Sequence, residues 1–252
     1  MNFDVAAESY DRYMGEWSRQ LSPQLADFAG VHPGQRVLDV GCGPGALTEE
    51  LIARVGSGSV AAVDPSAPFV DAVRARHPGV DVRQAAAETV PFPDDSFDAA
   101  LAQLVVQFMA DPVAGLREMA RVTHRGGIVA ACVWDFRGGR GPLAPFWEAV
   151  RATDSNAVDE SNLAGARHGH LGELFAAAGL TKVEEATFGA GRSYSTFGDW
   201  WEPFTCGVGP AGVYVAGLDP GRQADVRERC RSMLPAGPIV LTAAAWAARG
   251  VA

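Results

Sequence analysis

The stretch Val37-Leu-Asp-Val-Gly-Cys-Gly-Pro-Gly-Ala-Leu-Thr48 decides the fold. It begins with a short, largely apolar run of strand-forming residues and continues from residue 46 in a pattern that indicates a helix. Between them, Gly41, Gly43 and Gly45 allow a tight turn and leave no Cβ in the way of a ligand. The helix directs its free N–H groups and positive dipole end at this turn. The stretch therefore predicts a strand, a turn that binds a nucleotide-like cofactor, and a helix.

The turn by itself leaves the identity of the cofactor open. The pattern Gly41-x-Gly43-x-x-Ala46 satisfies the loose dinucleotide-binding fingerprint, which alone is a weak signal. No Gly-Lys-Ser/Thr follows, so the sequence does not favour a phosphate-binding P-loop. A tight turn with no ligand is the structural alternative, and the density of glycines around Asp39 argues against it.

A second apolar run, Val60-Ala-Ala-Val-Asp64, ends in a carboxylate 23 residues after Gly41. A carboxylate at this position accepts hydrogen bonds from the two hydroxyl groups of a ribose. The alternative is that Asp64 or Ser66 caps the helix that starts near residue 67. Because Ser66 can serve as the cap, we expect Asp64 to be free for the ligand.

A third segment separates the candidate cofactors. Residues 84–98 contain Ala-Glu-x-x-Pro-Phe and then Asp-x-Ser-Phe-Asp, which leads into a further strand. Together with the glycine turn and the acidic end of the second strand, these motifs resemble the class I S-adenosylmethionine-dependent methyltransferases, in particular the group similar to ubiquinone and menaquinone biosynthesis methyltransferases. The resemblance covers residues 5–135, and the combination is specific although each motif is loose.

The resemblance implies which residues hold the methionine end of S-adenosylmethionine. The backbone of Gly41, Cys42 and Gly43 would border it. Asp39 would shape the turn and face the amino group of the cofactor, directly or through water. Gln103, which follows the fourth strand, would lie near the sulfonium.

The resemblance also implies how the adenosine end is held. Asp64 would bind the ribose hydroxyls, Pro65 would lie against the adenine, and the N–H of Ala87 with the neighbouring Glu88 would follow the adenine edge. Many family members have Asp where this chain has Ala86. Adenine recognition here would therefore rest on backbone groups or on another side chain.

The N-terminal segment, residues 1–30, is rich in aromatic side chains and has two interpretations. Relatives have a similar segment that covers the cofactor, and in that interpretation Tyr13 and Trp17 contact S-adenosylmethionine. Alternatively, the segment is a helix whose aromatic residues pack against the sheet.

The resemblance implies an α/β fold: a Rossmann-like, seven-stranded methyltransferase sheet with helices on both faces. After the N-terminal helical lid segment, residues 31–252 form the methyltransferase domain. Insertions on the substrate side are expected after strand five, at about 136–168, and between strands six and seven, at about 194–235. The pattern of residues predicts strands at 36–40, 59–63, 80–84, 97–102, 127–134, 180–189 and 239–246, and helices at 45–55, 67–77, 112–124, 171–178 and 220–233.

The acceptor side of the site is less well defined by the sequence. Trp134 and Trp201 are candidates to line an aromatic pocket, although core or lid packing is the favoured explanation for either one alone. His168 is a candidate to deprotonate an acceptor, and an ordinary surface histidine is the alternative. No residue is assigned as catalytic, because methyl transfer needs a base only when the acceptor must lose a proton.

Composition limits the classes of partner. The net charge is −9 and no cluster of Lys or Arg is present, which argues against nucleic-acid binding. No apolar run is long enough for a membrane span, and no signal peptide is evident. The four cysteines show no metal-binding or disulfide spacing, so we expect no metal and a cytoplasmic location. The oligomeric state is left open.

The sequence thus favours transfer of a methyl group from S-adenosylmethionine to a small-molecule acceptor, which is apolar or aromatic. One alternative is an NAD(P)-dependent oxidoreductase on a similar sheet, which would not need Asp39 or the Ala-Glu-x-x-Pro-Phe segment. The other is a non-catalytic protein that binds S-adenosylmethionine.

Overall fold

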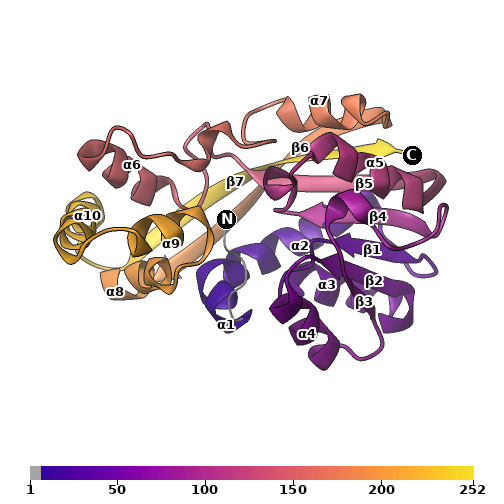
Figure 1. Cartoon of the computed structure of the whole chain (residues 1–252), viewed down its shortest axis with the longest axis horizontal. Helices are drawn as coiled ribbons and strands as arrows, with labels where there is room; N and C mark the ends of the chain where they lie inside the picture. The colour runs from indigo at the N-terminus through magenta and orange to yellow at the C-terminus, as the bar shows by residue number, and fades with distance from the viewer. Residues whose placement is uncertain (1–6) are drawn as a thin grey trace.

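The computed structural model describes residues 7–252, which form one mixed seven-stranded sheet covered by helices on both faces (Figure 1). The strand order is β3-β2-β1-β4-β5-β7-β6. Strands β1 to β5 are parallel to one another, and β7 runs antiparallel between β5 and β6. The strands are β1 Val37–Val40, β2 Val60–Asp64, β3 Asp81–Gln84, β4 Phe97–Gln103, β5 Thr123–Trp134, β6 Thr181–Tyr194 and β7 Ile239–Val251. The predicted seven-stranded α/β fold is confirmed.

The helical elements of the described chain fall before, between and after these strands. The α-helices are α1 Ala7–Tyr10, α2 Glu16–Ala29, α3 Ala46–Val55, α4 Ala67–Arg76, α5 Pro112–Val122, α6 Ala144–Thr153, α7 His170–Ala177, α8 Phe197–Trp201, α9 Gly209–Ala216 and α10 Pro220–Met233. The shorter turns are η1 Asp11–Gly15, η2 Ser57–Ser59, η3 Ala87–Thr89, η4 Val106–Phe108, η5 Glu160–Asn162 and η6 Glu202–Cys206.

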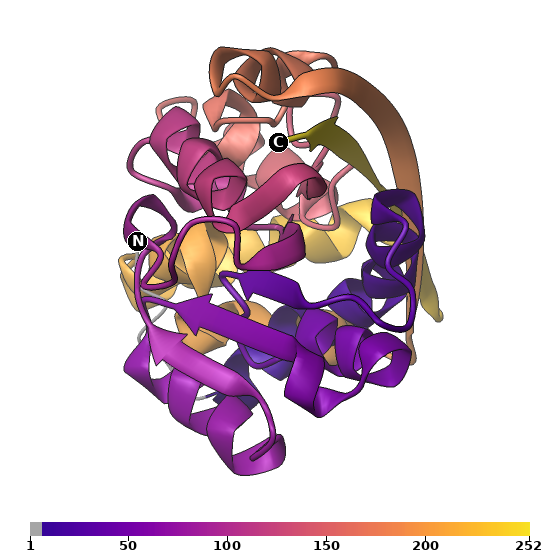
Figure 2. The ribbon, with the colours of Figure 1, turned by 90° about the vertical axis from the view of Figure 1, so that its right-hand side faces the viewer.

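The central strands are buried on both faces, as expected for parallel strands between two helical layers. In β1, Val37 belongs to a hydrophobic cluster that includes α2 and α3, whereas Leu38 belongs to a second cluster that includes α5 and α7. In Figure 2 the arrowheads of β1, β2 and β3 point toward the same edge of the sheet. Ligands of such sheets bind beyond this edge, where the order of the strands reverses between β1 and β4.

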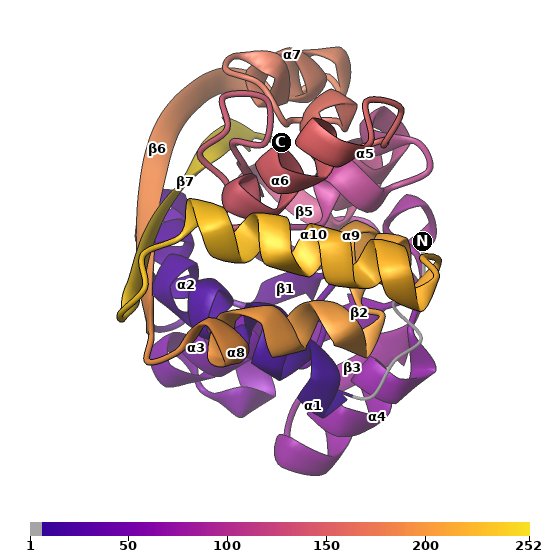
Figure 3. The ribbon, with the colours of Figure 1, turned by 90° about the vertical axis from the view of Figure 1, so that its left-hand side faces the viewer.

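Both predicted insertions lie beyond the parallel part of the sheet. Figure 3 shows α6, α8, α9 and α10 gathered at one end of the molecule, near the N-terminal helix. Helix α10 contacts α6, and η6 contacts η1. An aromatic cluster joins the two insertions, since Phe146 stacks on Phe204 with ring centroids 4.6 Å apart, and Trp200 packs on the same Phe204 ring.

Three of the predicted boundaries are wrong. The fifth strand is predicted at 127–134, but β5 begins at Thr123 and includes Gly126 and Gly127. Gly126 has φ +88° within this strand, and the pairing with β4 shifts register there. The β6–β7 hairpin is also longer than predicted, because its two strands pair from Thr181 to Tyr194 on one side and from Ile239 to Val251 on the other.

Candidate functional site

The glycine turn after β1 is held by the neighbouring strand. The backbone N–H groups of Gly41 and Cys42 both donate to the Val63 carbonyl, at 2.8 and 3.0 Å, and Gly43 N–H donates to Asp64 Oδ2 at 2.9 Å. The three N–H groups of the turn are thus already used within the protein, and the Cys42 carbonyl accepts from Gly45 N–H at 3.0 Å.

The two outer glycines of the Gly-Cys-Gly turn are required for different reasons. A Cβ on Gly41 would lie 2.5 Å from the Val105 side chain, so this glycine allows the loop after β4 to approach the turn. A Cβ on Gly43 would meet no atom of the described chain within 4 Å. Both residues have positive φ, but only Gly43 leaves open space beside it.

Asp64, at the end of β2, is buried and already makes two hydrogen bonds. Its Oδ2 accepts from Gly43 N–H and its Oδ1 accepts from Ser66 N–H at 2.8 Å. Ser66 is the N-cap residue of α4, but its side chain makes no capping hydrogen bond. The expectation that the Ser66 side chain caps the helix and leaves Asp64 free of local hydrogen bonds is therefore wrong. Each oxygen of Asp64 keeps a second lone pair for a further donor. Burial raises the pKa of Asp64 despite these two backbone donors.

Asp39 and Gln103 each have a buried oxygen with no hydrogen-bond partner in the described part of the chain. Thr48 Oγ1 donates to Asp39 Oδ2 at 2.6 Å, which leaves Asp39 Oδ1 unsatisfied. Gln103 Nε2 donates to the Ser18 carbonyl at 3.0 Å, so Gln103 Oε1 faces elsewhere and is also unsatisfied. Burial raises the pKa of Asp39 to about 7. Buried acceptors of this kind normally have a partner, so the pair indicates a site for a donor.

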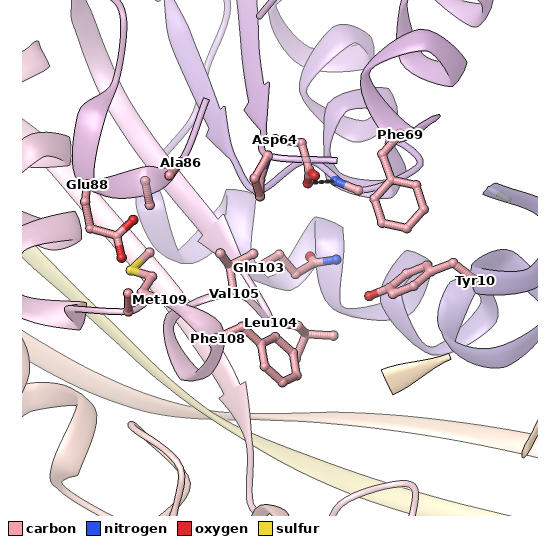
Figure 4. Close-up of a pocket in the computed structure, with 15 residues that line it drawn as sticks. Tyr10, Asp64, Phe69, Ala86, Glu88, Gln103, Leu104, Val105, Phe108 and Met109 are labelled. Carbon is pink, nitrogen blue, oxygen red and sulfur yellow. Dashed lines mark hydrogen bonds between the residues drawn. The ribbon is translucent and has the colours of Figure 1, made fainter. Parts of the chain in front are cut away.

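Both residues line a small cavity of about 30 Å³ against the glycine turn, here called the turn cavity. It adjoins a larger cavity of about 280 Å³, here called the outer cavity, with which it shares Gly41, Gly43, Gln103 and Tyr10. Figure 4 shows the outer cavity, with Asp64 on one side and Glu88 on another. The outer cavity is lined by Tyr10, Gly41, Gly43, Asp64, Pro65, Phe69, Ala86, Ala87, Glu88, Gln103, Leu104, Val105, Phe108, Met109 and Ala110.

The outer cavity brings together most of the residues predicted to hold a cofactor. Asp64, Pro65, Ala86, Ala87 and Glu88 line it. Glu88 is fixed by the N–H of Asp111, which donates to Glu88 Oε1 at 3.1 Å. The remaining walls are mostly apolar, so the cavity suits a flat ring with polar groups at its edge.

The N-terminal segment contributes directly to these cavities. Residues 7–29 form a nearly continuous helix in which η1 is a π-helical turn, a rare feature that is frequent at functional sites. The Tyr10 ring projects from this helix toward Gln103 and Leu104 (Figure 4). Residues 1–6 of the predicted lid segment lie outside the described residues. From Trp17 onward, one face of α2 is buried in the core.

A third cavity, here called the inner cavity, adjoins the outer one and shares Tyr10, Leu104 and Phe108 with it. Its volume is about 30 Å³. Its walls come from the N-terminal helix, the ends of β4 and β5, and both insertions. They are Tyr10, Tyr13, Met14, Leu104, Gln107, Phe108, Trp134, Phe136, Leu143, Glu160, Gly209 and Pro210.

Three residues that line the inner cavity have a buried polar atom with no hydrogen-bond partner among the described residues. The atoms are the Tyr13 hydroxyl, Trp134 Nε1 and Gln107 Oε1. Glu160 lines the same cavity and is 3% exposed, and its Oε2 accepts from Trp147 Nε1 at 2.7 Å. Burial raises the pKa of Glu160 to about 7, and burial together with the charge of Glu160 raises that of Tyr13.

Sequence reasoning missed Glu160, Gln107 and Tyr10 as cavity residues. Glu160 lies in a polar stretch of the first insertion with no motif around it, so no signal in one sequence distinguishes it from a surface glutamate. Gln107 follows β4 in the short turn η4, and only the fold brings it opposite Glu160. Tyr10 belongs to the aromatic N-terminal segment. The aromatic content of that segment pointed to the segment as a whole but did not single out Tyr10.

Three predicted site residues line none of the cavities described above. Trp17 is buried against Trp134, with ring centroids 6.1 Å apart. Trp201 packs within the aromatic cluster of the insertions, where it stacks on Phe197. His168 is exposed and packs edge-on against Trp246. The structure therefore assigns Trp17 and Trp201 to packing and His168 to the surface.

Residues 7–252 show neither a metal-binding cluster nor a helix that could span a membrane. No group of three or more His, Cys, Asp or Glu side chains among them is arranged to hold a metal ion. None of the helices in this part of the chain is both long enough and apolar enough to span a bilayer. All four cysteines are unpaired, and burial raises the pKa of Cys42 in the turn.

Sequence comparison finds methyltransferases. Residues 38–131 match the family model described as a methyltransferase domain. The chain is 32% identical over 149 residues to the aklanonic acid methyltransferase of Streptomyces sp. strain C5, which covers 57% of this chain and 68% of that protein. It is 37% identical over 127 residues to the malonyl-[acyl-carrier protein] O-methyltransferase of Erwinia billingiae, covering 50% of this chain and 49% of that protein.

The similarity to these relatives extends over only part of their length. A demethylmenaquinone methyltransferase of Mycobacterium sp. is 39% identical over 140 residues, covering 52% of this chain and 56% of that protein. The chain thus spans about half the length of several curated relatives that it matches. The family model ends at residue 131 and so includes neither insertion, both of which contribute to the inner cavity.

Solved structures are similar over nearly the whole chain. The YcgJ protein from Bacillus subtilis superimposes with a TM-score of 0.59 at 20% identity, covering 91% of this chain and 97% of that one. The geranyl diphosphate C-methyltransferase of Streptomyces coelicolor, solved with S-adenosyl-L-homocysteine, gives a TM-score of 0.51 at 17% identity, covering 92% and 77%. At these identities the likeness establishes the fold.

Proposed function

Because this chain belongs to the class I S-adenosylmethionine-dependent methyltransferases, we propose that it transfers a methyl group from S-adenosylmethionine to a small, largely apolar acceptor. The observation that carries the proposal is the pair of unsatisfied buried oxygens, Asp39 Oδ1 and Gln103 Oε1, in the turn cavity. This cavity opens from one large enough for a nucleoside. S-adenosylmethionine has an ammonium group, a sulfonium and a nucleoside in that order, which matches the succession of the two cavities.

The residues present fit this cofactor on three grounds. Asp39 Oδ1 and Gln103 Oε1 need donors, and an ammonium group supplies them. Gly43 leaves space into which a Cβ would project. Asp64 stands at the end of β2 with lone pairs to spare for two hydroxyl groups.

Each end of the cofactor would then have its own residues. Asp39, Gln103 and the carbonyl side of the Gly41-Cys42-Gly43 turn would hold the amino-acid end. Asp64 would accept from the ribose hydroxyls, and Pro65 would border the adenine.

Recognition of the adenine would rest on Ala87 N–H and on Glu88. A side chain at residue 86 cannot contribute, because this residue is alanine. Fixation of Glu88 by Asp111 N–H keeps its carboxylate at the edge of the outer cavity.

When bound, S-adenosylmethionine supplies an electrophilic methyl group for an in-line displacement. The chain's own contribution is to position the two reactants and to exclude water. Tyr10, Leu104 and Phe108 stand where the outer and inner cavities meet, so they would border the reacting groups. Tyr13 and Trp134 would lie on the acceptor side, in the inner cavity.

The division of the chain follows from these roles. The residues of 1–30 that the structure describes would cover the cofactor through Tyr10 and border the acceptor through Tyr13. The insertions at about 136–168 and 194–235 would close the acceptor side through Glu160, Gly209 and Pro210. The cytoplasmic location and the lack of a nucleic-acid partner stay predictions from the sequence.

The NAD(P)-dependent oxidoreductase is not favoured, since the relatives are methyltransferases. Thermal unfolding of the protein with S-adenosylhomocysteine, NAD or NADP separates the two functions. S-adenosylhomocysteine at about 100 times its Kd stabilises the native state by ~2.7 kcal/mol. We expect a higher Tm with this ligand and no shift with either dinucleotide.

Two valine variants make this measurement specific for the turn. Gly43→Val should unfold cooperatively but show no shift with S-adenosylhomocysteine, because its side chain would occupy the ligand's space. Gly56→Val is the matched control, since Gly56 also has positive φ and open space but lies at the far end of α3. A shift with NADP alone, or a normal shift in Gly43→Val, contradicts the proposal.

A further inference from the structure

The polar groups of the inner cavity are complementary to one kind of chemical group. Trp134 Nε1 can only donate a hydrogen bond, and the Tyr13 hydroxyl can donate or accept. Gln107 Nε2 donates to the Leu104 carbonyl at 2.9 Å, which can only accept, so the oxygen of Gln107 is the amide atom left without a partner among the described residues. Glu160 adds a carboxyl group. A group that pairs with all of these must both donate and accept.

A hydroxyl group has this property, whereas an ammonium group only donates and a carboxylate only accepts. An ammonium group would leave Trp134 Nε1 without an acceptor. A carboxylate would face Glu160, which repels it when ionised.

Glu160 is positioned to act on that hydroxyl rather than only to support the wall. It is held by one hydrogen bond, from Trp147 Nε1 to Oε2, and no hydrogen bond among the described residues reaches its other oxygen. The neighbouring Asp159 is engaged by Arg151 and caps η5. The titratable or charged groups that act on Glu160 are thus Asp159, paired with Arg151, and Tyr13.

We propose, building on the methyltransferase function above, that the inner cavity receives an acidic hydroxyl of the acceptor, phenolic or enolic, and that Glu160 takes its proton. The acceptor's O–H bond breaks, and the proton moves to a Glu160 oxygen. The acceptor oxygen uses an electron pair to bond the methyl carbon, and the electrons of the broken carbon–sulfur bond stay on sulfur. Glu160 afterwards releases the proton to solvent.

The acidity of the two partners makes this transfer feasible. The pKa of Glu160 is raised by burial to about 7, and a phenol has a pKa of about 10. A base whose pKa lies near the working pH is an efficient proton acceptor. An alkyl alcohol is far less acidic, so Glu160 is matched to phenols and enols rather than to alcohols.

The test uses the protein saturated with S-adenosylhomocysteine and three probes: phenol, anisole and benzoate. Phenol can donate to Glu160, anisole cannot, and benzoate is an anion at every pH used. We expect phenol to bind about 10- to 100-fold more tightly than anisole at pH 8. We expect benzoate to bind more weakly at pH 8, where Glu160 is mostly ionised, than at pH 6, where it is mostly neutral.

Two glutamine variants identify the residue responsible. Glu160→Gln keeps an oxygen for Trp147 but carries no charge, so the preference for phenol should fall to about 5-fold or less and the pH effect on benzoate should vanish. Glu148→Gln is the matched control, because Glu148 is an exposed glutamate in the same insertion. It should behave as the wild type does.

The outcomes separate this proposal from the one on which it rests. If S-adenosylhomocysteine does not bind, the proposed methyltransferase function has failed. If it binds and the wild type does not prefer phenol to anisole, or none of the probes binds, the assignment of the inner cavity is overturned. A Glu160→Gln variant that keeps both the preference and the pH effect overturns the role of Glu160.

Discussion

Asp39 shows how a single residue links the stability of the fold to the site. Its carboxyl group is almost fully buried, has one donor in Thr48, and has a pKa raised to about 7. A buried carboxyl group that lacks a second donor costs free energy unless it is protonated or a ligand supplies that donor.

This pKa predicts a pH dependence of stability. In the unfolded chain Asp39 has a pKa of about 3.9, so between about pH 4 and pH 7 the native state binds more protons than the unfolded state. The contribution of Asp39 to the free energy of unfolding is fully present below pH 4 and is lost as the pH rises through 7. At ~1.4 kcal/mol per pKa unit, the free energy of unfolding should fall by ~2 to 4 kcal/mol across this window.

Urea unfolding at several pH values measures the effect. Asp39→Asn should remove this part of the slope, whereas Asp81→Asn, which alters an exposed aspartate, should retain it. Saturation with S-adenosylhomocysteine should also reduce the slope, because its ammonium group favours the ionised carboxylate. A slope that is the same in wild type and Asp39→Asn would remove Asp39 from this role.

At the scale of elements, α2 and the N-terminal turns combine the two interpretations that the sequence left open. Leu21 and Leu25 of α2 are fully buried, which is core packing. Gln20 and Gln24 on the same helix each exchange two hydrogen bonds with the backbone of β6, at Gly191 and Gly189. They occupy backbone groups at the free edge of the sheet and fix α2 in place.

Residues 7–15 differ from α2 in that they border the site, since Tyr10 lines all three cavities. We expect S-adenosylhomocysteine to increase hydrogen-exchange protection in residues 8–15 and at the glycine turn, 41–45. Protection of residues 17–29 should stay the same, since that part of α2 is packed with or without ligand. Equal protection of residues 8–15 in both states would mean that this segment is fixed core.

The elements were predictable where the pattern is local and strong. The strand around Leu38, the glycine turn and the acidic end at Asp64 follow from a few adjacent residues. The start of β5 at Thr123 was not, because pairing with β4 outweighs the turn preference of Gly126. The sequence also could not predict that the Val63 carbonyl accepts from the N–H groups of Gly41 and Cys42, because this depends on how β1 and β2 are placed side by side.

The candidate site divides in the same way. Asp39, Asp64, Glu88 and Gln103 lie in motifs, and they line the outer and turn cavities as the family pattern implies. Glu160 comes from an insertion that has no motif, and only the tertiary structure places it in the inner cavity. The same lack of pattern explains why His168 was a candidate although it lies on the surface.

At the scale of the whole molecule, three adjoining cavities lie beyond the carboxyl ends of the parallel strands. The sheet supplies the residues that border the outer and turn cavities, and the insertions supply part of the inner one. The match to the methyltransferase family model, over residues 38–131, covers the strands that border the outer and turn cavities but neither insertion. The acceptor-side segments can then differ between relatives while the fold is retained.

The measurement that tests the central claim most directly is calorimetric titration of S-adenosylhomocysteine into the wild type and the Asp64→Ala variant. We predict one site per chain in the wild type and a loss of ~1 to 3 kcal/mol of binding free energy in the variant, since the ribose hydroxyls lose a charged acceptor. Asp81→Ala, at an exposed aspartate, should bind as the wild type does. No binding by the wild type, or equal affinity in Asp64→Ala, would contradict the account.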